Sequence, residues 1–341
     1  MKQHRAALAL GLVLLGCGTL ATEAGDVDAE RPNALAGPFR LLAKDEVDSL
    51  DAPYVLKKKF SDFRDGTVLA IDPAVVLGET ALYAVATQQG TPAIYRFLAP
   101  DGRSFSETAD PAAPVLAADA SWEGASVEAP EIARVGDEIW LFYSAQGGIG
   151  AARSSDGTSF EKLGLVLGPE SGGWEQGKSP RAPAFVEVAS GDYRLFYEAN
   201  DRIGEARSSD GTAWERVGSE PVLEPAQASS GEPAFDAQSV GDPEALLATS
   251  AEGRRILRVY YTGRAADGAS GIGLAARFGA EGPLSRAAAP AFASTRRPYA
   301  PAVLPQGEVT LLFVTQGSSL KDEWPAIAAG IAPATRRIPL K

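Results

Sequence analysis

Five positions in this 341-residue chain place a chemically active side chain next to, or two residues before, a proline that opens a short apolar segment. The five are Asp72, Glu128, Arg181, Asp242 and Tyr299. The carboxyl groups among them could give and take protons, as general acid–base catalysis requires. The guanidinium group could instead hold an anion through paired hydrogen bonds. We therefore treat these positions as the candidate site.

Composition limits the chemistry available elsewhere in the chain. The single His and the single Cys are His4 and Cys17, so the folded part lacks a Ser/His/Asp triad, a Cys/His dyad and a His/Cys zinc site. A formal net charge of −12 disfavours a polyphosphate partner, and we expect no nucleic acid to bind. No contiguous loop of calcium ligands is present, so we assign no metal and no cofactor.

The elements that must position these residues come from an internal repeat. Residues 122–164 and 174–218 share an aromatic-acid start, an Ala-Pro step, a strand-like segment ending in Phe-Tyr, an Ile-Gly segment and Ser-Ser-Asp-Gly. Weaker copies lie on both sides, and the repeated proline falls at Pro73, Pro130, Pro183, Pro243 and Pro301, at intervals of 57, 53, 60 and 58 residues. Five copies of one unit therefore run from about residue 63 to the C-terminus.

Each copy holds four short segments rich in Val, Ile, Phe and Tyr, separated by Gly, Asp, Asn and Ser turns, and none shows a sustained helical period. The sequence therefore predicts an all-β fold, a five-bladed β-propeller with four antiparallel strands per blade, over residues 38–341. Two unrelated β domains with chance similarity are the alternative. How the ring closes stays open, since residues 38–60 could add a strand to the last blade or cap one face.

Small residues before proline fit the crowded axis of a propeller, where innermost strands converge. Ala129, Ala182 and Ala300 occupy this place. The variable side chains beside them would line a central funnel, and the alternative is that these polar strand ends only face water in the channel. The Ser-Ser-Asp-Gly segments at 154–157 and 208–211 are predicted to be structural turns.

Trp122 and Trp174 open the two best-matched repeats at corresponding places. Packing between blades is the favoured role for both, and a platform for stacking on a sugar is the alternative.

Five repeats, turns of the form Ser-Ser-Asp-Gly-x-x-aromatic and an acidic residue beside proline together resemble the five-bladed glycoside hydrolases of the arabinanase, β-xylosidase, invertase and levansucrase group. The resemblance covers about residues 60–335. AIDPAVV around Asp72 looks like the motif of the aspartate that modulates a pKa in these enzymes, and VEAPEI around Glu128 looks like their general-acid motif. The resemblance implies that Glu128 is the general acid and Asp72 the modulator or base.

The third carboxylate of that family is not identified. With Asp72 as modulator the base should lie on the last blade, which presents Tyr299, and with Asp72 as base the third blade should present Glu, where Arg181 stands. The alternatives for the base are Asp242, Glu131 and Glu244, or residues before the first repeat such as Asp51 and Asp62.

Arg181 also weighs against Glu128 as an acid, because a neighbouring cation favours the ionised carboxylate. The same cation could hold a uronate, or a phosphate as in phosphorolytic relatives with this fold.

Residues 1–16 have the layout of an export signal, with Lys2 and Arg5 before an apolar stretch. Leu14-Leu15-Gly16-Cys17 resembles the bacterial lipobox, which implies acylation of Cys17, and an ordinary signal peptide with an incidental Cys is the alternative. Residues 17–37 lack periodicity and are predicted to be a flexible tether. Gly18 rather than Asp follows the Cys, and the resemblance to Gram-negative lipoproteins then implies the outer membrane of the cell envelope, with the lipid as the only membrane contact.

These observations predict a membrane-anchored, glycosidase-like propeller that acts on or binds an oligo- or polysaccharide through acidic funnel residues and Arg181. Glu128, Asp72 and Asp242 are the candidate catalytic residues, and the candidate substrate-binding residues are Arg181, Tyr299, Glu131 and Glu244. The alternatives are a propeller that binds carbohydrate without catalysis and one that binds proteins.

Overall fold

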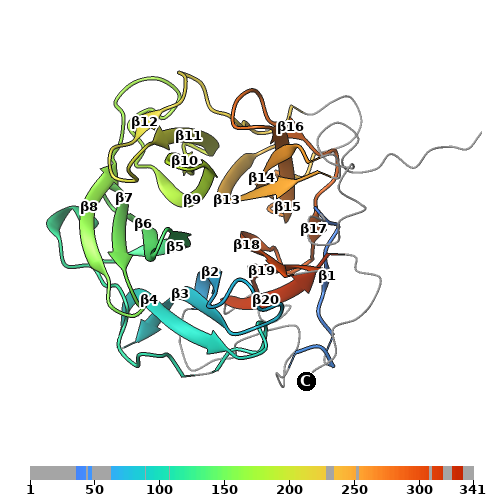
Figure 1. Ribbon diagram of the computed structural model, residues 1–341. Coiled ribbons are helices and arrows are strands. Elements are labelled where there is room, and N and C mark those ends of the chain that lie inside the picture. Colours follow the sequence, from blue (N-terminus) through green and yellow to red (C-terminus); the bar gives the residue numbers. More distant parts are fainter. Residues whose placement is uncertain are drawn as a thin grey trace, which may run out of the picture.

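A computed structural model of the chain describes residues 36–43, 45–47, 63–88, 90–106, 108–227, 234–250, 253–306, 309–317 and 325–332. The predicted export signal, Cys17, Asp51 and Asp62 lie outside the described residues. Figure 1 shows the sheets arranged in a ring around a central axis. The predicted all-β fold, a five-bladed β-propeller, is confirmed.

The strands follow one another round the ring in chain order. They are β1 (Arg40–Leu41), β2 (Phe63–Ala70), β3 (Thr80–Gln88), β4 (Thr91–Ala99), β5 (Glu128–Val135), β6 (Glu138–Ala145), β7 (Gly148–Ser154), β8 (Glu161–Leu167), β9 (Arg181–Ala189), β10 (Asp192–Ala199), β11 (Arg202–Ser208), β12 (Glu215–Arg216), β13 (Ser239–Thr249), β14 (Arg255–Arg264), β15 (Ser270–Phe278), β16 (Ser285–Arg286), β17 (Phe292–Ala293), β18 (Tyr299–Gln306), β19 (Val309–Gly317) and β20 (Pro325–Ile331). A short 3-10 turn, Ser121–Glu123, precedes β5.

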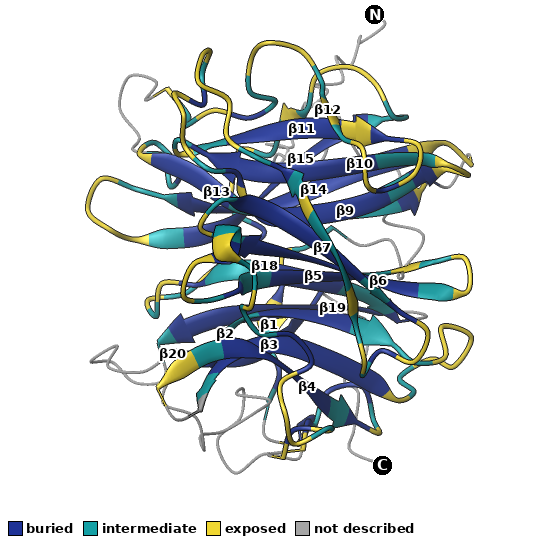
Figure 2. Ribbon diagram, turned by 90° about the vertical axis from the view of Figure 1, so that its left-hand side faces the viewer, coloured by how far each residue is buried: buried dark blue, intermediate teal, exposed yellow. Residues whose placement is uncertain are grey.

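Every blade is an antiparallel sheet, and in blades 1 to 4 the first strand along the chain is the innermost one. Blades 2 and 3 are β5–β8 and β9–β12, with four strands each. Blade 1 has β2, β3 and β4, and a single bridge between Ile94 and Leu116 extends it. Blade 4 has β13–β16, with β17 also paired to β15. Figure 2 shows the strands mostly buried and the connecting loops mostly exposed, so packed blade faces form the core.

Blade 5 joins the two ends of the described chain. Its order is β1-β20-β19-β18, in which Arg40 pairs with Ile331 and Leu41 with Gly330. The backbone N–H of Leu42 also donates to the carbonyl of Ala329 at 3.0 Å. The question left open by the sequence is thereby answered: the segment after residue 38 supplies the outermost strand of the last blade.

Near its start, each innermost strand has one residue in the left-handed region of φ. These residues are Asp65 (φ 50°), Ala129 (42°), Ala182 (47°), Asp242 (43°) and Ala300 (47°). At the same place each inner strand shifts register against its second strand, as a β-bulge does. The bulge turns the start of each strand, and the side chains there, toward the axis.

Side chains of the preceding blade hold four of these bulges. Their hydroxyl or carboxylate oxygens accept a hydrogen bond from the backbone N–H of the left-handed residue: Thr315 from Asp65, Ser144 from Ala182, Glu198 from Asp242 and Thr262 from Ala300, at 2.7–3.1 Å. Neighbouring blades therefore fix the strand starts that surround the axis.

The register predicted for the first repeat is wrong. β2 begins at Phe63, so Arg64 and Asp65 occupy the places that Glu128 and Ala129 hold in blade 2. Asp72 instead lies exposed in a turn after β2, where its Oδ1 accepts a hydrogen bond from the N–H of Ala74 at 2.9 Å. The repeated proline is absent from β2 because Gly66 stands in its place.

The Ser-Ser-Asp-Gly segments form structural turns, as predicted. Asp156 Oδ1 accepts backbone hydrogen bonds from Thr158 and Ser159, and Gly157 has φ 71°. The carbonyl of Gly157 accepts a 2.9 Å hydrogen bond from the Tyr83 hydroxyl of blade 1. The turn therefore locks blade 2 onto its neighbour.

Trp122 and Trp174 stack on tyrosines at 6.0 Å and pack against clusters formed between adjacent blades.

Candidate functional site

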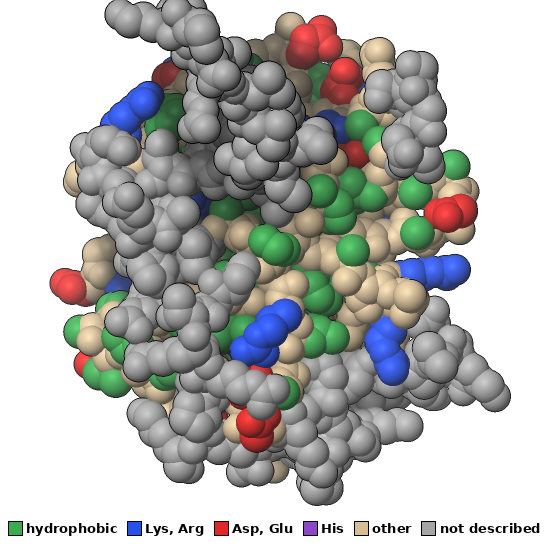
Figure 3. All heavy atoms as spheres, turned by 90° about the vertical axis from the view of Figure 1, so that its right-hand side faces the viewer, with side chains coloured by type: hydrophobic (Ala, Val, Ile, Leu, Met, Phe, Trp, Pro, Cys, Tyr) green, Lys and Arg blue, Asp and Glu red, His purple; other side chains and the backbone are tan. Residues whose placement is uncertain are grey.

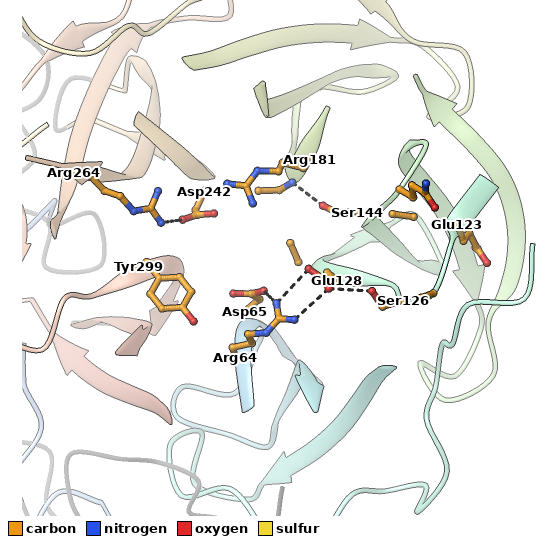
Figure 4. A pocket seen from close by; sticks show the side chains of 15 residues that line it. Arg64, Asp65, Glu123, Ser126, Glu128, Ser144, Arg181, Asp242, Arg264 and Tyr299 are labelled. Carbon is orange, nitrogen blue, oxygen red and sulfur yellow. Dashed lines mark hydrogen bonds and ion pairs between the residues drawn. The ribbon is translucent and has the colours of Figure 1, made fainter. Parts of the chain in front are cut away.

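A pocket of about 380 Å³ lies at the propeller axis, and the bulged strand starts of all five blades contribute to its wall. We call it the axial pocket. Figure 4 shows its principal side chains, which are Arg64 and Asp65 from β2, Glu128 from β5, Arg181 from β9, Asp242 from β13 and Tyr299 from β18. Four of the five positions first selected from the sequence therefore meet in one pocket. Asp72 is not among its lining residues, and Arg64 and Asp65 were missed.

Arg64 bridges two carboxylates in this pocket. Its Nη1 lies 2.6 Å from Asp65 Oδ2 and 3.4 Å from Glu128 Oε2, so these two oxygens are separated by at most the sum, about 6 Å. Its Nη2 lies 3.2 Å from Glu128 Oε1, which also accepts a 3.0 Å hydrogen bond from the Ser126 hydroxyl. The side chain of Asp65 is 12% exposed and that of Glu128 is 41% exposed.

The two carboxyl groups respond oppositely to their surroundings. Burial raises the pKa of Asp65 to about 6, because it outweighs the opposing charge of Arg64, and the charge of Asp242 adds to the rise. Burial also pushes up the pKa of Glu128, but the hydrogen bonds and charges of Arg64, Ser126 and Arg181 together bring this pKa below its ordinary value. Near neutral pH, Asp65 is therefore much the readier of the two to carry a proton.

Arg181 is held by a carboxylate that the sequence did not suggest. Its Nε and Nη2 lie 3.0 and 2.6 Å from Oε1 of Glu198, a buried residue on the second strand of the same blade. The Arg181 side chain is nevertheless 55% exposed, so part of the guanidinium faces the axial pocket. Arg181 lowers the pKa of Glu128, as predicted, but Arg64 lowers it more.

Asp242 and Tyr299 complete the side of the pocket away from Glu128. Arg264 Nη2 lies 3.5 Å from Asp242 Oδ2, and the ring of Tyr299 stands beside this pair (Figure 4). Asp65 and Asp242 lie on opposite sides of the axis with Arg181 near the second (Figure 4). Charged groups of both signs therefore surround a space open enough for a polar ligand.

The structure separates Glu131 and Glu244 from the axial pocket. Both are buried, on the inner strands just past the ring of prolines, and they border a second space of only about 30 Å³. Glu131 Oε1 accepts the N–H of Phe185 at 3.2 Å, and Glu244 Oε1 accepts the N–H of Val303 at 2.9 Å. Their carboxyl groups also hydrogen-bond each other, and burial raises both pKa values. They tie blades together rather than line the wall where a substrate would bind.

Among the residues that the structure describes, no three His, Cys, Asp or Glu side chains are grouped as metal ligands. No described helix is long and apolar enough to span a membrane. On the face at the right of Figure 1, the described basic and acidic side chains are scattered, without a block of like charge (Figure 3).

No family model matches the sequence, and no curated protein matches it. Similarity appears at the level of structure. A glycosyl hydrolase from Bacteroides ovatus superposes with a TM-score of 0.61 at 14% identity, covering 93% of this chain and 97% of that one. The β-1,2-mannobiose phosphorylase of Listeria innocua, in complex with β-1,2-mannobiose, gives 0.63 at 13% identity, covering 85% and 96%.

An exo-1,5-α-L-arabinanase from a bovine ruminal metagenomic library gives a TM-score of 0.55 at 12% identity, covering 81% of this chain and 94% of that chain. This chain has their fold. The resemblance to propeller glycoside hydrolases predicted from the sequence is thus confirmed for the architecture, over nearly the whole described chain.

Proposed function

We propose that the axial pocket binds a sugar of a glycan and cleaves its glycosidic bond, with Asp65 as the general acid and Glu128 as the ionised partner. One observation carries this proposal: two carboxyl groups within about 6 Å of each other have pKa values shifted in opposite directions. Environments that separate the pKa values of neighbouring carboxyl groups mark an acid and a base. The glycan-active proteins that share the fold support the choice of substrate.

The chemistry follows from the protonation states. Asp65 would donate its proton to the glycosidic oxygen as the bond to the anomeric carbon breaks. Glu128 would stabilise the positive charge that develops on the sugar, or attack the anomeric carbon from the other side. A water molecule or a phosphate would then bond to the anomeric carbon and release the sugar from Glu128, while the Asp65 carboxylate takes back a proton. A separation of at most about 6 Å lies below the roughly 6.5–9.5 Å that an inverting enzyme needs for an intervening water and closer to the retaining arrangement.

This assignment reverses the roles expected from the sequence, in which Glu128 was the acid. Asp65 takes over the place that was given to Asp72, on the inner strand of blade 1. Arg181 and Tyr299 keep their predicted role in binding the substrate, because they line the same pocket. Asp242, a candidate base in the sequence, would position sugar hydroxyls beside them.

The test is a screen of aryl glycosides and oligosaccharides, with and without inorganic phosphate, followed by variants on any substrate that turns over. Asp65→Asn and Glu128→Gln should each lower kcat by about 10²–10⁴-fold while sparing the fold. Asp72→Asn is the matched control, since it makes the same chemical change on an exposed turn. Full activity of Asp65→Asn, or an equal loss in Asp72→Asn, would contradict the proposal.

One observation favours a second candidate, a pocket that binds a glycan without cleaving it. Arg64 fills the space between Asp65 and Glu128 with ion pairs, and both reacting groups need that space free. On this alternative, glycan arrays would show binding that Arg181→Ala weakens, with no product released.

Export and lipidation at Cys17 stay proposals based on the sequence alone. Labelled palmitate should enter the protein in a bacterial host, and Cys17→Ser should abolish labelling and release the protein from the membrane fraction. Labelling that survives this substitution would refute the proposal.

A further inference from the structure

Another hollow, of about 420 Å³ and separate from the small space beside Glu131 and Glu244, adjoins the axial pocket on the side of Tyr299. Arg264 and Tyr299 line both spaces, so the two spaces meet at these side chains. We call this hollow the arginine pocket, after Arg264, Arg296 and Arg297, which line it together with Ser270, Tyr299 and Gln316. It lies at the junction of blades 4 and 5.

The arginine pocket differs from the axial pocket in its balance of charge. In the axial pocket, carboxylates accompany the cations. The described residues that line the arginine pocket include three arginines and no acidic side chain. In a chain with a formal net charge of −12, such a set creates a local site that favours an anion over a neutral ligand.

A buried amide in the wall lacks a partner. The side chain of Gln316 on β19 is fully buried, and neither its Nε2 nor its Oε1 has a hydrogen-bond partner. A buried polar group without a partner costs free energy unless a ligand or water satisfies it. The backbone beside Gln316 also places a cation, because Arg296 Nη1 donates to the carbonyl of Gly317 at 3.3 Å.

We propose that the arginine pocket binds the carboxylate of a uronic acid, so that the glycan recognised by this protein is acidic. The inference rests on the proposed function and names the class of its substrate. A guanidinium fork matches the two oxygens of a carboxylate, and the Tyr299 hydroxyl and the Gln316 amide offer hydrogen bonds to the same sugar. The Ser270 hydroxyl donates to the carbonyl of Pro298 at 2.8 Å and can still accept a hydrogen bond from a sugar hydroxyl. The carboxylate belongs to the sugar in the axial pocket or to its neighbour.

The test compares each charged oligosaccharide with its own neutral form. Calorimetry on the full chain would use oligogalacturonates, oligomannuronates and oligoglucuronates, each beside its carboxyl-reduced counterpart. For at least one pair, the acidic form should bind at least about tenfold more tightly. The double variant Arg296→Gln/Arg297→Gln should reduce this ratio to near one and leave the affinity for the neutral form unchanged.

The matched control is Arg207→Gln, because Arg207 is an exposed arginine on β11 that lines neither pocket. This variant should keep the preference for the acidic form. Melting temperatures of all variants should equal that of the parent protein, so that a lost preference is not a lost fold.

Three results would overturn the inference. Equal binding of acidic and neutral forms that both depend on Asp65 would remove the acidic substrate class and leave the proposed function standing. Inorganic phosphate bound in place of any sugar carboxylate, and lost in the double variant, would make the pocket a site for a free anion. Failure of every oligosaccharide to bind, together with no effect of Asp65→Asn on any measured activity, would remove the proposed function as well.

Discussion

Arg64 sets the charge state of the axial pocket, since it contacts both carboxylates that are assigned to the chemistry. Its charge lowers the pKa of Asp65 against the effect of burial and is the main cause of the lowered pKa of Glu128. Protonation of the site is therefore linked to where this one guanidinium lies. A sugar that displaced Arg64 would itself raise both pKa values and favour the protonated acid.

The first prediction concerns this residue. Arg64→Met removes the cation, so the pKa values of Asp65 and Glu128 should both rise. The pH–rate profile needs Asp65 protonated and Glu128 ionised, so both of its limbs should move to higher pH. Steady-state kinetics over pH 4–9 would measure the shift, with Arg207→Met as the control. Limbs that stay in place would mean that other groups govern the profile.

A second prediction concerns Glu131 and Glu244, whose buried carboxyl groups hydrogen-bond each other. Burial raises the pKa of Glu244 to about 8, well above its unfolded value. A raised pKa means that the pair contributes its full stability below the unfolded value near 4.5 and loses it as pH rises through about 8. The melting temperature should therefore fall as pH rises from about 5 to 8, the range between the unfolded and folded pKa values.

Glu244→Gln tests the cause of this pH dependence, because an amide keeps a donor for Glu131 and does not titrate. The variant should show a smaller fall in melting temperature over this range, and the fall that remains should come from Glu131, whose pKa burial also raises. A melting temperature of the parent protein that rises over this range would contradict the assignment.

At the scale of the elements, three blades repeat one anchor in which a buried carboxylate binds a tyrosine and a cation. In blade 2, Glu123 accepts hydrogen bonds from the Tyr143 hydroxyl and the Lys162 ammonium, both at 2.7 Å. Glu175 and Asp236 make the equivalent contacts in blades 3 and 4. The aromatic-acid start of these three repeats, visible in the sequence, therefore fixes the blade to the chain that precedes it.

The third prediction follows from this anchor. Burial raises the pKa of Glu123, but hydrogen bonds from Lys162, two backbone N–H groups and Tyr143 lower it to about 2. A depressed pKa contributes stability above about 4.5 that is lost as pH falls toward 2. Glu123→Gln should cost about 3 kcal/mol at pH 7 and less at pH 3, by urea denaturation.

Glu161→Gln is the control for this anchor, because Glu161 is an exposed residue of the same blade whose ion pair with Arg153 is solvent-accessible. It should change the free energy of unfolding by less than about 0.5 kcal/mol. Equal losses of unfolding free energy in the two variants would show that the buried anchor stabilises the blade no more than an exposed ion pair does.

The repeat was sufficient to predict the ring of blades and to bring four candidate residues to one axis. It failed in blade 1, where Gly66 replaces the proline that marked the other inner strands, and Asp72-Pro73 offered a false match. An added Cβ at Gly66 would approach the Cδ1 atoms of Ile327 and Leu82 to 2.6 and 2.8 Å, so any larger residue there would force these two side chains to shift. Had strand pairing rather than proline fixed the register, Asp65 would have stood beside Glu128.

Partners that lie across a sheet could not be predicted in the same way. Glu198 holds Arg181 from the neighbouring strand, and nothing in the repeat marks Glu198, because Ser144 and Thr262 take its place in other blades. These side chains share an acceptor role rather than a residue type. This shared acceptor role becomes visible only when the register between the paired strands is known.

At the scale of the whole molecule, the ring closes through non-covalent pairing of its two chain ends, β1 with β20. Phe39 and Leu42, which flank β1, are 7% and 3% exposed, and Phe39 packs against Tyr260 of blade 4. The segment therefore buries apolar surface on two blades as well as covering a strand edge. Most of the stability that this segment adds to the ring therefore comes from the burial of Phe39 and Leu42.

The fourth prediction tests this closure. A chain that starts at residue 44 should lose about 4 kcal/mol of stability, from the burial of Phe39 and Leu42, and should self-associate through the uncovered edge of β20. A chain that starts at residue 36 keeps β1 and should melt like the parent protein. Thermal denaturation and light scattering would compare the two. Equal stability would show that β1 adds nothing to the ring.

The closure also determines how the propeller would respond to force. Any load applied through the residues that precede β1 reaches the ring first at a two-residue strand, held by few backbone hydrogen bonds. The strands inside each blade share much longer ladders, which resist the same load together. Under tension, the propeller would therefore open where β1 pairs with β20, while its blades remain folded. β1 would be the mechanically weakest point between the N-terminal segment and the axial pocket.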